Sequence, residues 1–559
     1  MHTNPLLVRL MAGAALTLSL NQPATAQTGH INFNWGDEYE LPKRHEDLGF
    51  IGNAKDGYIQ VGHDDHESLS FQKFDAKLHL KSERETSLEK LPKDYQSVSL
   101  TNLGDKYYWF FNTYKKADDR ESIYAQEIDL KTADMKGPAK ELLSSSKLTG
   151  DMQAGGFFHF ELVNKWNFYY AFDNSKVLIQ YRKKPLQKDD SRNNDVMGFF
   201  VFDNNMNKIW GREVRMPYTE EKMDNGDYQV DSRGNVYMLA KVYDELRSRD
   251  RKHPNYHFEI LRWSAENPEV TKIPFRFTDK FVNAANIVED AAGNIVAAGY
   301  YTTRRNSGST DGVFVLKLDE QNNEFTPIKK GIYPFPTSVM TQYESARTKR
   351  RMERKEEKGE VEDAHLRLHT IALNADGSMQ IFGEEQFIVV STYTNGRSSH
   401  TTTTYYYNDI MAMSIGADGE MKWVKKIPKA QTRVENSMGY GFGYTPLFNT
   451  IPKRSAAGGL SFKHFGYKKD SYLFFMDNMK NLDIEKDETP KWHRDGAGGV
   501  LMAIKIDENG NVSKSKVFDV REEKMTLTVS NFNQVDFNEM IVRGRAKRRD
   551  SQAALVTFE

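Results

Sequence analysis

A short pattern recurs along this chain, in which a turn carrying Gly, Asp or Asn leads into an apolar strand, and a second apolar strand follows and closes on an acidic residue. In the clearest copy, residues 286–319, Asp290 and Gly293 form the turn, and Asp311 and Asp319 bracket the second strand. A unit made only of strands cannot bury both of its faces alone, so such repeats must pack against one another. No other feature of the sequence constrains the fold as strongly.

Eight segments fit the second strand of the pattern, and the shorter separations between them match one four-stranded blade with its loops. We therefore expect an all-β fold, a single β-propeller of eight blades, with seven blades as the alternative. The segments are residues 69–75, 123–129, 196–203, 258–264, 313–319, 410–417, 500–507 and 553–559.

The two ends of the chain complement each other. Residues 31–41 have the character of a strand with no partner nearby in the sequence, while the last repeat stops after its third strand. Pairing the N-terminal strand with the last repeat would remove two exposed strand edges. The sequence therefore predicts a ring closed by its N- and C-terminal strands.

The repeat around Gly293 resembles bacterial β-propeller repeat families, whose consensus has a D-x-x-G-N turn, an apolar strand ending in Gly, and a later D-x-F-V-x-K-L-D strand. The resemblance is good over one repeat and partial over two or three. It implies a propeller and an extracytoplasmic location, and it implies no activity. The matching residues are Asp290, Gly293, Asn294, Gly299, Asp311, Phe314, Val315, Lys317, Leu318 and Asp319.

The first 26 residues are predicted to be a signal peptide. An apolar stretch at residues 10–20 is shorter than the roughly 20 residues that a membrane-spanning helix needs, and Ala24-Thr25-Ala26 provides the small residues of a cleavage site. We expect a periplasmic or secreted protein whose residues 27–559 form the propeller, with a charged insertion at about 341–363. The chain has no Cys, so no disulfide can stabilise the fold.

The overall charge argues against two classes of partner. Lys and Arg total 77, Asp and Glu total 78, and the net charge is −1. Nucleic acids and anionic membranes are bound through a basic excess, which is missing here. We expect no nucleic-acid partner, no membrane insertion and a monomeric protein.

No metal or cofactor is predicted. The sequence Gly62-His63-Asp64-Asp65-His66 is the densest group of possible metal ligands, but adjacent residues of a strand point in opposite directions, so a polar loop at a blade rim is the preferred interpretation. His365 and His369 are interpreted as ordinary strand histidines. The acidic residues that close the third strands recur at the same place in each repeat, as expected for turn caps and not for catalytic acids.

Two aromatic segments remain as functional candidates. Residues 394–407 are predicted to form an extended hairpin, and residues 437–446 alternate Gly with aromatic rings. Exposed rings of this kind bind sugars or proteins, although the same rings could instead pack under their own loops. The predicted ligand-binding residues are Tyr405, Tyr406, Tyr440, Phe442 and Tyr444.

These observations favour an exported, non-catalytic module that binds a protein or a glycan through loops on one propeller face. The alternative is a polysaccharide-active hydrolase or lyase with carboxylates at the central channel. No catalytic residues can be assigned, because the sequence contains no G-x-S-x-G, P-loop or Cys nucleophile.

Overall fold

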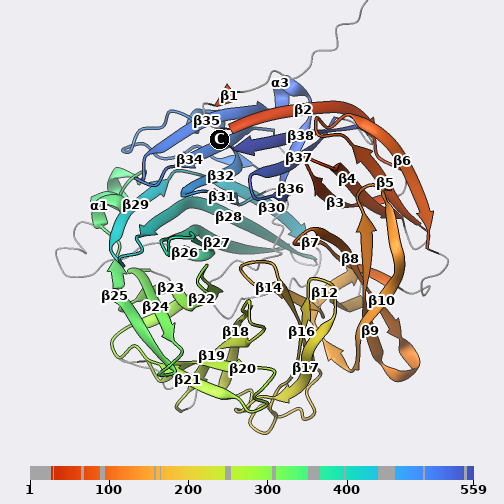
Figure 1. Cartoon of the computed structure of the whole chain (residues 1–559). Helices are drawn as coiled ribbons and strands as arrows, with labels where there is room; N and C mark the ends of the chain where they lie inside the picture. The colour runs from red at the N-terminus through yellow and green to blue at the C-terminus, as the bar shows by residue number, and fades with distance from the viewer. Residues whose placement is uncertain are drawn as a thin grey trace, which may run out of the picture.

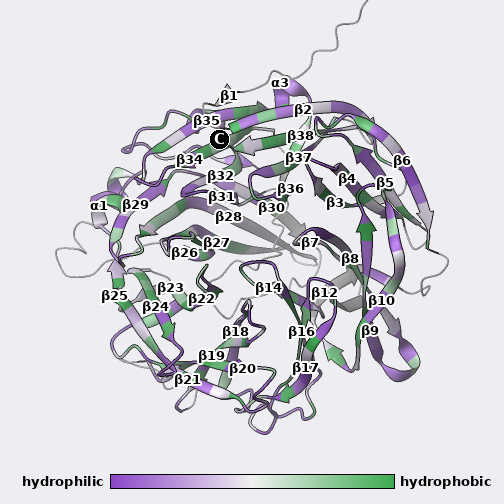
Figure 2. Ribbon diagram, in the orientation of Figure 1, coloured by the Kyte–Doolittle hydropathy of each residue, from purple (hydrophilic) through white to green (hydrophobic). Residues whose placement is uncertain are grey.

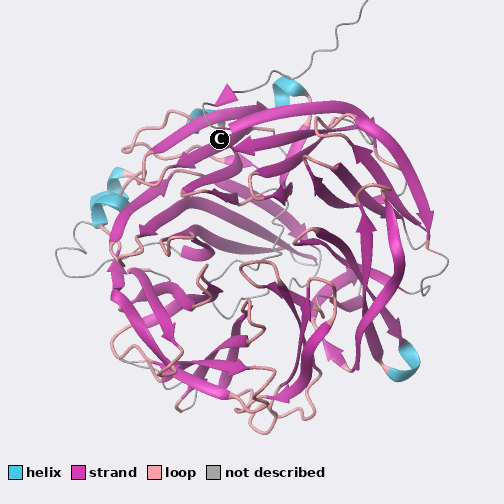
Figure 3. Cartoon of the chain, viewed as in Figure 1, coloured by secondary structure: helices cyan, strands magenta, loops and turns pink. Residues whose placement is uncertain are grey.

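The computed structural model shows a ring of β-sheets (Figures 1 and 3). The helical segments among the described residues are short: η1 (Lys116–Asp118), α1 (Thr337–Met340), residues 346–350, η3 (Met479–Asn481) and α3 (Val520–Glu523). No helix in the described part of the chain is long and apolar enough to cross a lipid bilayer. The structure describes residues 27–28, 31–43, 45–64, 68–88, 95–156, 159–163, 165–245, 254–304, 310–350, 366–395, 398–437, 460–494, 498–546 and 550–558.

A small two-stranded sheet lies before blade 3 in the chain, and each of the other eight sheets among the described residues is a blade whose four main strands run antiparallel from the inner edge of the ring to its rim. From the inner strand outward, blade 1 contains β3 (His45–Asn53), β4 (Gly57–Asp64), β5 (Ser68–Phe74) and β6 (Leu80–Ser87), and blade 2 contains β7 (Tyr95–Leu103), β8 (Lys106–Lys115), β9 (Arg120–Asp129) and β10 (Asp134–Ser146). Blade 3 contains β14 (Asn167–Tyr170), β15 (Lys176–Lys183), β16 (Val196–Asp203) and β17 (Lys208–Arg215). Blade 4 contains β18 (Met223–Val230), β19 (Val236–Tyr243), β20 (Tyr256–Trp263) and β21 (Thr271–Phe275). The short strands β11 (Leu148–Thr149), β12 (Asp151–Gly156) and β13 (His159–Val163) precede blade 3.

The last four blades follow the same plan, and the final one takes its outer strand from the N-terminus. Blade 5 contains β22 (Phe281–Glu289), β23 (Ile295–Thr302), β24 (Gly312–Asp319) and β25 (Glu324–Pro334), and blade 6 contains β26 (Leu366–Leu373), β27 (Met379–Asn395), β28 (Ser398–Ile415) and β29 (Met421–Ile427). Blade 7 contains β31 (Lys463–Tyr467), β32 (Asp470–Asp477), β34 (Val500–Ile506) and β35 (Val512–Asp519). Blade 8 contains β36 (Thr526–Asp536), β37 (Glu539–Arg545), β38 (Asp550–Phe558) and β2 (Ile31–Glu40). Blade 6 is extended by β30 (Gln431–Ser437) and β33 (His493–Arg494), and β1 (Gln27–Thr28) pairs with β2.

The eight-blade prediction is confirmed, and the seven-blade alternative is wrong. Each of the eight predicted segments coincides with the third strand of a blade, from β5 in blade 1 to β38 in blade 8. The signal was readable because every blade repeats the same strand between the same kinds of turn.

The turn chemistry expected from the sequence is present. Asp290 Oδ1 accepts hydrogen bonds from the backbone amides of Ala292 (2.9 Å) and Asn294 (2.8 Å), and Gly293 has a φ of +78°. That φ is accessible to Gly at little cost, which explains why Gly recurs at this place. The acid closing the third strand works in the same way, since Asp319 Oδ1 accepts from the amide of Gln321 (3.0 Å). These carboxylates are turn caps.

The hydrophobic core is divided among the junctions between blades. Eight clusters of buried residues occupy the eight junctions, because each sheet is covered on both sides. In β34, Leu501 packs in the cluster toward blade 8 and Met502 packs in the cluster toward blade 6. Successive apolar residues therefore face different neighbours, so strands such as β34 are hydrophobic (green in Figure 2) along their length.

The predicted ring closure is confirmed. Strand β2 pairs antiparallel with β38, with Ile31 opposite Phe558 and Glu40 opposite Asp550. Ile31 and Phe33 are buried against blade 7, and Tyr39 is buried against blade 1. The N-terminal strand therefore supplies both hydrogen bonds and core side chains to the last blade (Figure 1).

The charged insertion predicted at about residues 341–363 falls between blades 5 and 6 in the order of the chain. Its first residues belong to the ring, since the Tyr343 side chain is buried and Glu344 forms an ion pair with Lys426 (2.9 Å). Residues 351–365 lie outside the described residues, as do residues 1–26 with the predicted signal peptide.

Candidate functional site

Blade 6 carries an extension that the other blades lack. Beyond their blade pairing, β27 and β28 continue to pair from Gln386 opposite Tyr407 to Asn395 opposite Ser398, and β30 adds a third strand. This confirms the hairpin predicted for residues 394–407. The hairpin runs inward from the rim of blade 6 toward the middle of the ring in Figure 1. We call these three strands, with β33 at their edge, the ribbon.

A register shift decides which side chains share a face of the ribbon. Glu384 lies opposite Ile410, but Gln386 lies opposite Tyr407, so β28 has one extra residue at this point. Since side chains of a strand alternate between faces, this bulge exchanges the faces of all the residues that precede it in β28. It places Tyr407 and Tyr405 on the same side of the sheet as Glu384, and Tyr406 on the opposite side.

The side of the ribbon that carries Tyr407, which we call the Tyr407 face, begins above a buried ion pair. Lys429 Nζ lies 2.6 Å from Glu384 Oε1, and both side chains are fully buried. Lys429 Nζ also donates to the Tyr407 backbone oxygen and to Gln431 Oε1, each at 3.0 Å. The second carboxylate oxygen, Glu384 Oε2, accepts from Ser461 Oγ at 2.7 Å. A buried charge needs such partners, and here they fix the base of the ribbon.

Arg367 is the charged side chain beside this pair. It lies directly opposite Glu384 on the inner strand β26, so the two side chains share one face of the sheet. Burial lowers the pKa of Arg367, and the nearby Tyr407 and Glu384 act in the opposite direction. Glu384 already bonds Lys429, and no ion pair joins Arg367 to another described residue. Its half-buried guanidinium is therefore available for a bound anion.

The hydroxyl group of Tyr407 is the second free group at this site. Burial raises the pKa of Tyr407 to about 12, and the neighbouring Glu384 adds to this effect. The side chain is half-buried, and its hydroxyl bonds no other described side chain. At neutral pH it is a protonated phenol that can donate a hydrogen bond or a proton.

Histidines surround the site on blades 6 and 7. His369 on β26 stacks on Phe462 with ring centroids 3.9 Å apart, and His464 Nε2 lies 3.0 Å from Ser471 Oγ. Burial lowers the pKa of His369 and of His464 to about 3, and that of His493 to about 4. These imidazoles are neutral at physiological pH. His369 is packed in a strand, as the sequence predicts, while His365 lies outside the described residues.

The neutral histidines predict a loss of stability in acid. Their pKa values are about 6.5 in the unfolded chain, so between pH 6.5 and pH 4 the unfolded chain binds more protons than the folded one, and stability falls as the pH falls. Each fully buried imidazole lowers the free energy of unfolding by up to about 1.4 kcal/mol for each pH unit of acidification. His369 and His464 lower it by less, because solvent reaches their side chains. Burial raises the pKa of Asp477 to about 7, which opposes this trend in the same range.

Urea denaturation at pH 7.0, 6.0 and 5.0 measures this effect. We expect the free energy of unfolding to decrease at each step, and the His493→Gln protein to show a smaller decrease than wild type. Equal free energies at pH 7.0 and 5.0 would contradict the proposed protonation states.

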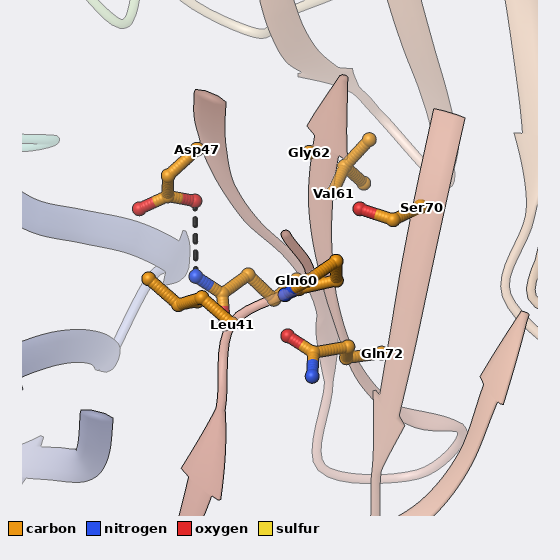
Figure 4. A pocket seen from close by; sticks show the side chains of 8 residues that line it. Leu41, Asp47, Gln60, Val61, Gly62, Ser70 and Gln72 are labelled. Carbon is orange, nitrogen blue, oxygen red and sulfur yellow. Dashed lines mark hydrogen bonds between the residues drawn. The ribbon is translucent and has the colours of Figure 1, made fainter. Parts of the chain in front are cut away.

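The carboxylate of Asp47, at the inner edge of blade 1, already has partners within the protein. Asp47 on β3 forms an ion pair with Arg543 (2.8 Å) and accepts from Gln60 Nε2 (3.0 Å), as Figure 4 shows for Gln60. The cavity beside Asp47 has a volume of about 10 Å³, room for one water molecule and not for a sugar. Asp47 is therefore a structural group.

A larger hollow of about 580 Å³ lies between blades 6 and 7 at the opposite ends of the strands, among the tight turns. Its charged side chains already neutralise each other, since Lys469 pairs with Asp376 (2.9 Å) and Lys422 with Asp418 (2.6 Å). Compared with the Tyr407 face, it offers no free charged group for a reaction.

The possible metal ligands near His63 do not assemble into a site among the described residues. His63 ends the part of β4 that pairs with β5, and the loop that follows β4, residues 65–67, lies outside the described residues. Within the described ranges, no group of three or more His, Asp or Glu side chains is arranged to hold a metal ion.

Of the five predicted ligand-binding residues, the structure places only Tyr405 and Tyr406. Tyr405 and Tyr406 are neighbours on β28 and therefore point to opposite faces of the ribbon. Tyr440, Phe442 and Tyr444 lie outside the described residues. Sequence reasoning missed Arg367, Glu384, Tyr407 and Lys429, and the only available signal was the run of three tyrosines.

The comparisons with known proteins assign no family to the chain. No protein-family model matches the chain, and no curated protein matches it. Among solved structures, an ulvan lyase from a polysaccharide lyase family is 10% identical with a TM-score of 0.36, covering 82% of this chain and 91% of the lyase. An oligogalacturonate lyase in complex with manganese is 9% identical with a TM-score of 0.29, covering 83% and 98%. The acylaminoacyl peptidase of Pyrococcus horikoshii is 8% identical with a TM-score of 0.32, and the chain spans 57% of its length.

The prediction of a non-catalytic binding module is wrong by this comparison, because these propeller proteins are lyases and peptidases. Identities and TM-scores this low assign no substrate and no mechanism, so these must come from the residues of this chain. The group formed by Arg367, Glu384, Tyr407 and Lys429 could not be recognised from the sequence. These residues come from three strands and a connecting loop and form no contiguous motif.

Proposed function

We propose that this chain is a polysaccharide lyase that cleaves a uronic-acid polymer by β-elimination at the Tyr407 face. The observation that carries the proposal is the pairing of an available cation, Arg367, with the free phenol of Tyr407 beside it. This is the lyase form of the enzymatic alternative considered from the sequence. An exported enzyme would meet such a polymer outside the cytoplasm, in agreement with the signal peptide predicted for residues 1–26.

The chemistry requires one cation and one proton donor. Arg367 would pair with the uronate carboxylate and so stabilise the negative charge that develops when the C5–H bond breaks. The electron pair of that bond forms the C4=C5 double bond, the C4–O bond breaks, and Tyr407 protonates the departing oxygen. In this syn elimination the Tyr407 oxygen takes the proton from C5 as the phenol gives its own proton to the departing oxygen, so Tyr407 serves as both acid and base and the reaction needs no co-reactant.

The carboxylate beside the site favours a lyase over a hydrolase. Glycoside hydrolysis generally uses two carboxyl groups on either side of the scissile bond. Glu384 is fully buried and bonded through both oxygens, to Lys429 and to Ser461 and Gln386. It cannot serve as one of the pair without breaking the base of the ribbon. Arg367 and Tyr407, in contrast, are both free to act.

The protein comprising residues 27–559 should be incubated with polygalacturonate, alginate, hyaluronan and a glucuronan. We expect the ultraviolet absorbance of the conjugated C4=C5 double bond to rise with at least one polymer, and not with the carboxyl-reduced form of that polymer. The Tyr407→Phe protein should react about 100-fold more slowly.

The matched control is Tyr124→Phe, which removes a hydroxyl that donates to Glu141 (3.0 Å) on blade 2 and should leave the rate unchanged. New reducing ends without the absorbance would indicate hydrolysis and reject the lyase proposal. A fully active Tyr407→Phe protein would reject the role of Tyr407.

A further inference from the structure

We infer that the opposite side of the ribbon, the Tyr406 face, is a second carbohydrate subsite that stacks on the ring faces of pyranose units. The inference rests on the proposed function, because a polymer that reaches the Tyr407 face must extend beyond it, and the Tyr406 face belongs to the same three strands. The ligand class is a linear glycan recognised by its apolar ring faces and not by its charge.

The Tyr406 face carries a row of three aromatic rings. Phe387 lies opposite Tyr406 on the neighbouring strand, and their rings stack with centroids 4.4 Å apart and planes 13° apart. Trp492 meets Tyr406 edge to face, with centroids 5.4 Å apart and planes 69° apart. Each ring is held by the next, so the row is ordered before any ligand arrives, which lowers the entropy lost on binding.

The backbone positions Trp492 at the end of this row. Asn478 Nδ2 donates to the Trp492 backbone oxygen (3.0 Å), and the next residue, His493, pairs with Gln431 of β30. On β30 the residue opposite Tyr406 is Thr432, whose small side chain leaves Trp492 free to reach Tyr406 across the strand. Strands lie about 4.8 Å apart, so a row across the ribbon is about 10 Å long and suits consecutive rings of a linear polymer.

The row is open to solvent and continues into further apolar surface. Trp492 is 49% exposed, and Val389 and Val434, on the adjacent cross-strand row, are 43% and 49% exposed. Large exposed apolar side chains usually occur singly, and a contiguous group of them marks a binding surface. Ile388 and Val390 are also exposed, but they lie on the Tyr407 face, since they pair with Tyr405 and Thr403.

The chemistry of the row fits a sugar. It carries no ionisable group other than the Tyr406 phenol, and Thr404 and Thr432 supply hydroxyl groups beside the rings. Phe387 and Tyr406 cover one face of each other, so the ring offered to a pyranose is chiefly that of Trp492, whose partially negative face attracts the partially positive C–H groups of the sugar. This recognition does not need a carboxylate, which separates it from the role of Arg367.

Titration calorimetry with neutral hexasaccharides tests the inference without relying on lyase activity. The full mature chain carrying Tyr407→Phe should be titrated with cello-, xylo- and mannohexaose. We expect at least one of them to bind, and Trp492→Ala or Phe387→Ala, each added to that chain, to weaken binding about tenfold, a typical effect for a buried aromatic contact. The control Phe537→Ala removes an exposed ring (69%) on another blade and should leave the affinity unchanged.

Three outcomes would overturn the inference. The first is that no neutral hexasaccharide binds, and the second is that the affinity is unchanged in both the Trp492→Ala and the Phe387→Ala proteins. The third is a concentration-dependent dimer that these substitutions abolish, which would make the face a contact between two copies of this chain. Failure of the proposed lyase function would appear separately, as missing double-bond absorbance with intact binding of the neutral glycan. Thermal unfolding of each variant verifies that it is folded.

Discussion

Replacing Arg367 by Ala is expected to lower kcat/KM for the uronate polymer by about 1000-fold. The substitution removes the cation that would hold the substrate carboxylate and stabilise the charge at C5, and losing one such electrostatic group costs about 100- to 1000-fold in rate. Because Arg367 forms no ion pair with another described residue, its loss should leave the stability of the protein nearly unchanged.

The rate of double-bond absorbance, measured over a range of polymer concentrations, checks this expectation. Arg367→Lys should recover part of the activity, because it keeps the charge and loses the bidentate geometry. The matched control is Arg262→Ala, which removes a guanidinium that donates to Asn323 (2.9 Å) on the side of the ring formed by blades 4 and 5. An Arg367→Ala enzyme within a few-fold of wild type would remove the central observation behind the proposed function.

Deleting residues 27–42 is expected to prevent the ring from forming a stable fold. The deletion removes β2, exposes the edge of β38 and takes Ile31, Phe33 and Tyr39 out of two inter-blade clusters. Burying each such side chain contributes about 1.5–3 kcal/mol, and the lost strand pairing adds to this. The sum approaches the total stability of a typical domain, about 5–15 kcal/mol, so aggregation through the exposed edge should follow.

Circular dichroism melting and size-exclusion chromatography measure this effect. The control replaces residues 351–363 by a Gly-Ser linker of equal length and leaves Tyr343 and Glu344, which pack against the ring, in place. That protein should melt close to the parent. Identical melting of the truncated protein and the parent would contradict the role of β2 in the fold.

The fold could be predicted because each repeat carries its own local signals. An Asp that caps a turn and a Gly with positive φ are needed wherever a hairpin of this type forms, as at Asp290 and Gly293, so they recur at readable spacing. Strands packed between two blades are apolar along their length, as β34 is, which distinguishes them from surface strands. The closure followed from counting strands in the last repeat.

The candidate site could not be predicted in the same way. Tyr405 and Tyr406 were grouped because they are adjacent in sequence, but adjacent residues of a strand face opposite sides. The bulge in β28, which decides that Tyr407 and not Tyr406 lies above Glu384, has no signature in the sequence. Arg367 and Lys429 are single residues in unremarkable contexts, and only the pairing of the strands brings them together.

The closure of the ring also has a consequence for the order in which the protein can be made. Gln552 Nε2 donates to the backbone oxygen of Gly36, a contact between residues 516 positions apart. Strand β2 is therefore synthesised long before β38, the strand it pairs with. Until then its apolar side chains have no place in any blade, and contacts this distant form slowly. A newly made chain should therefore stay open until β38 has been synthesised, and its apolar side chains require protection from aggregation until that strand closes the ring.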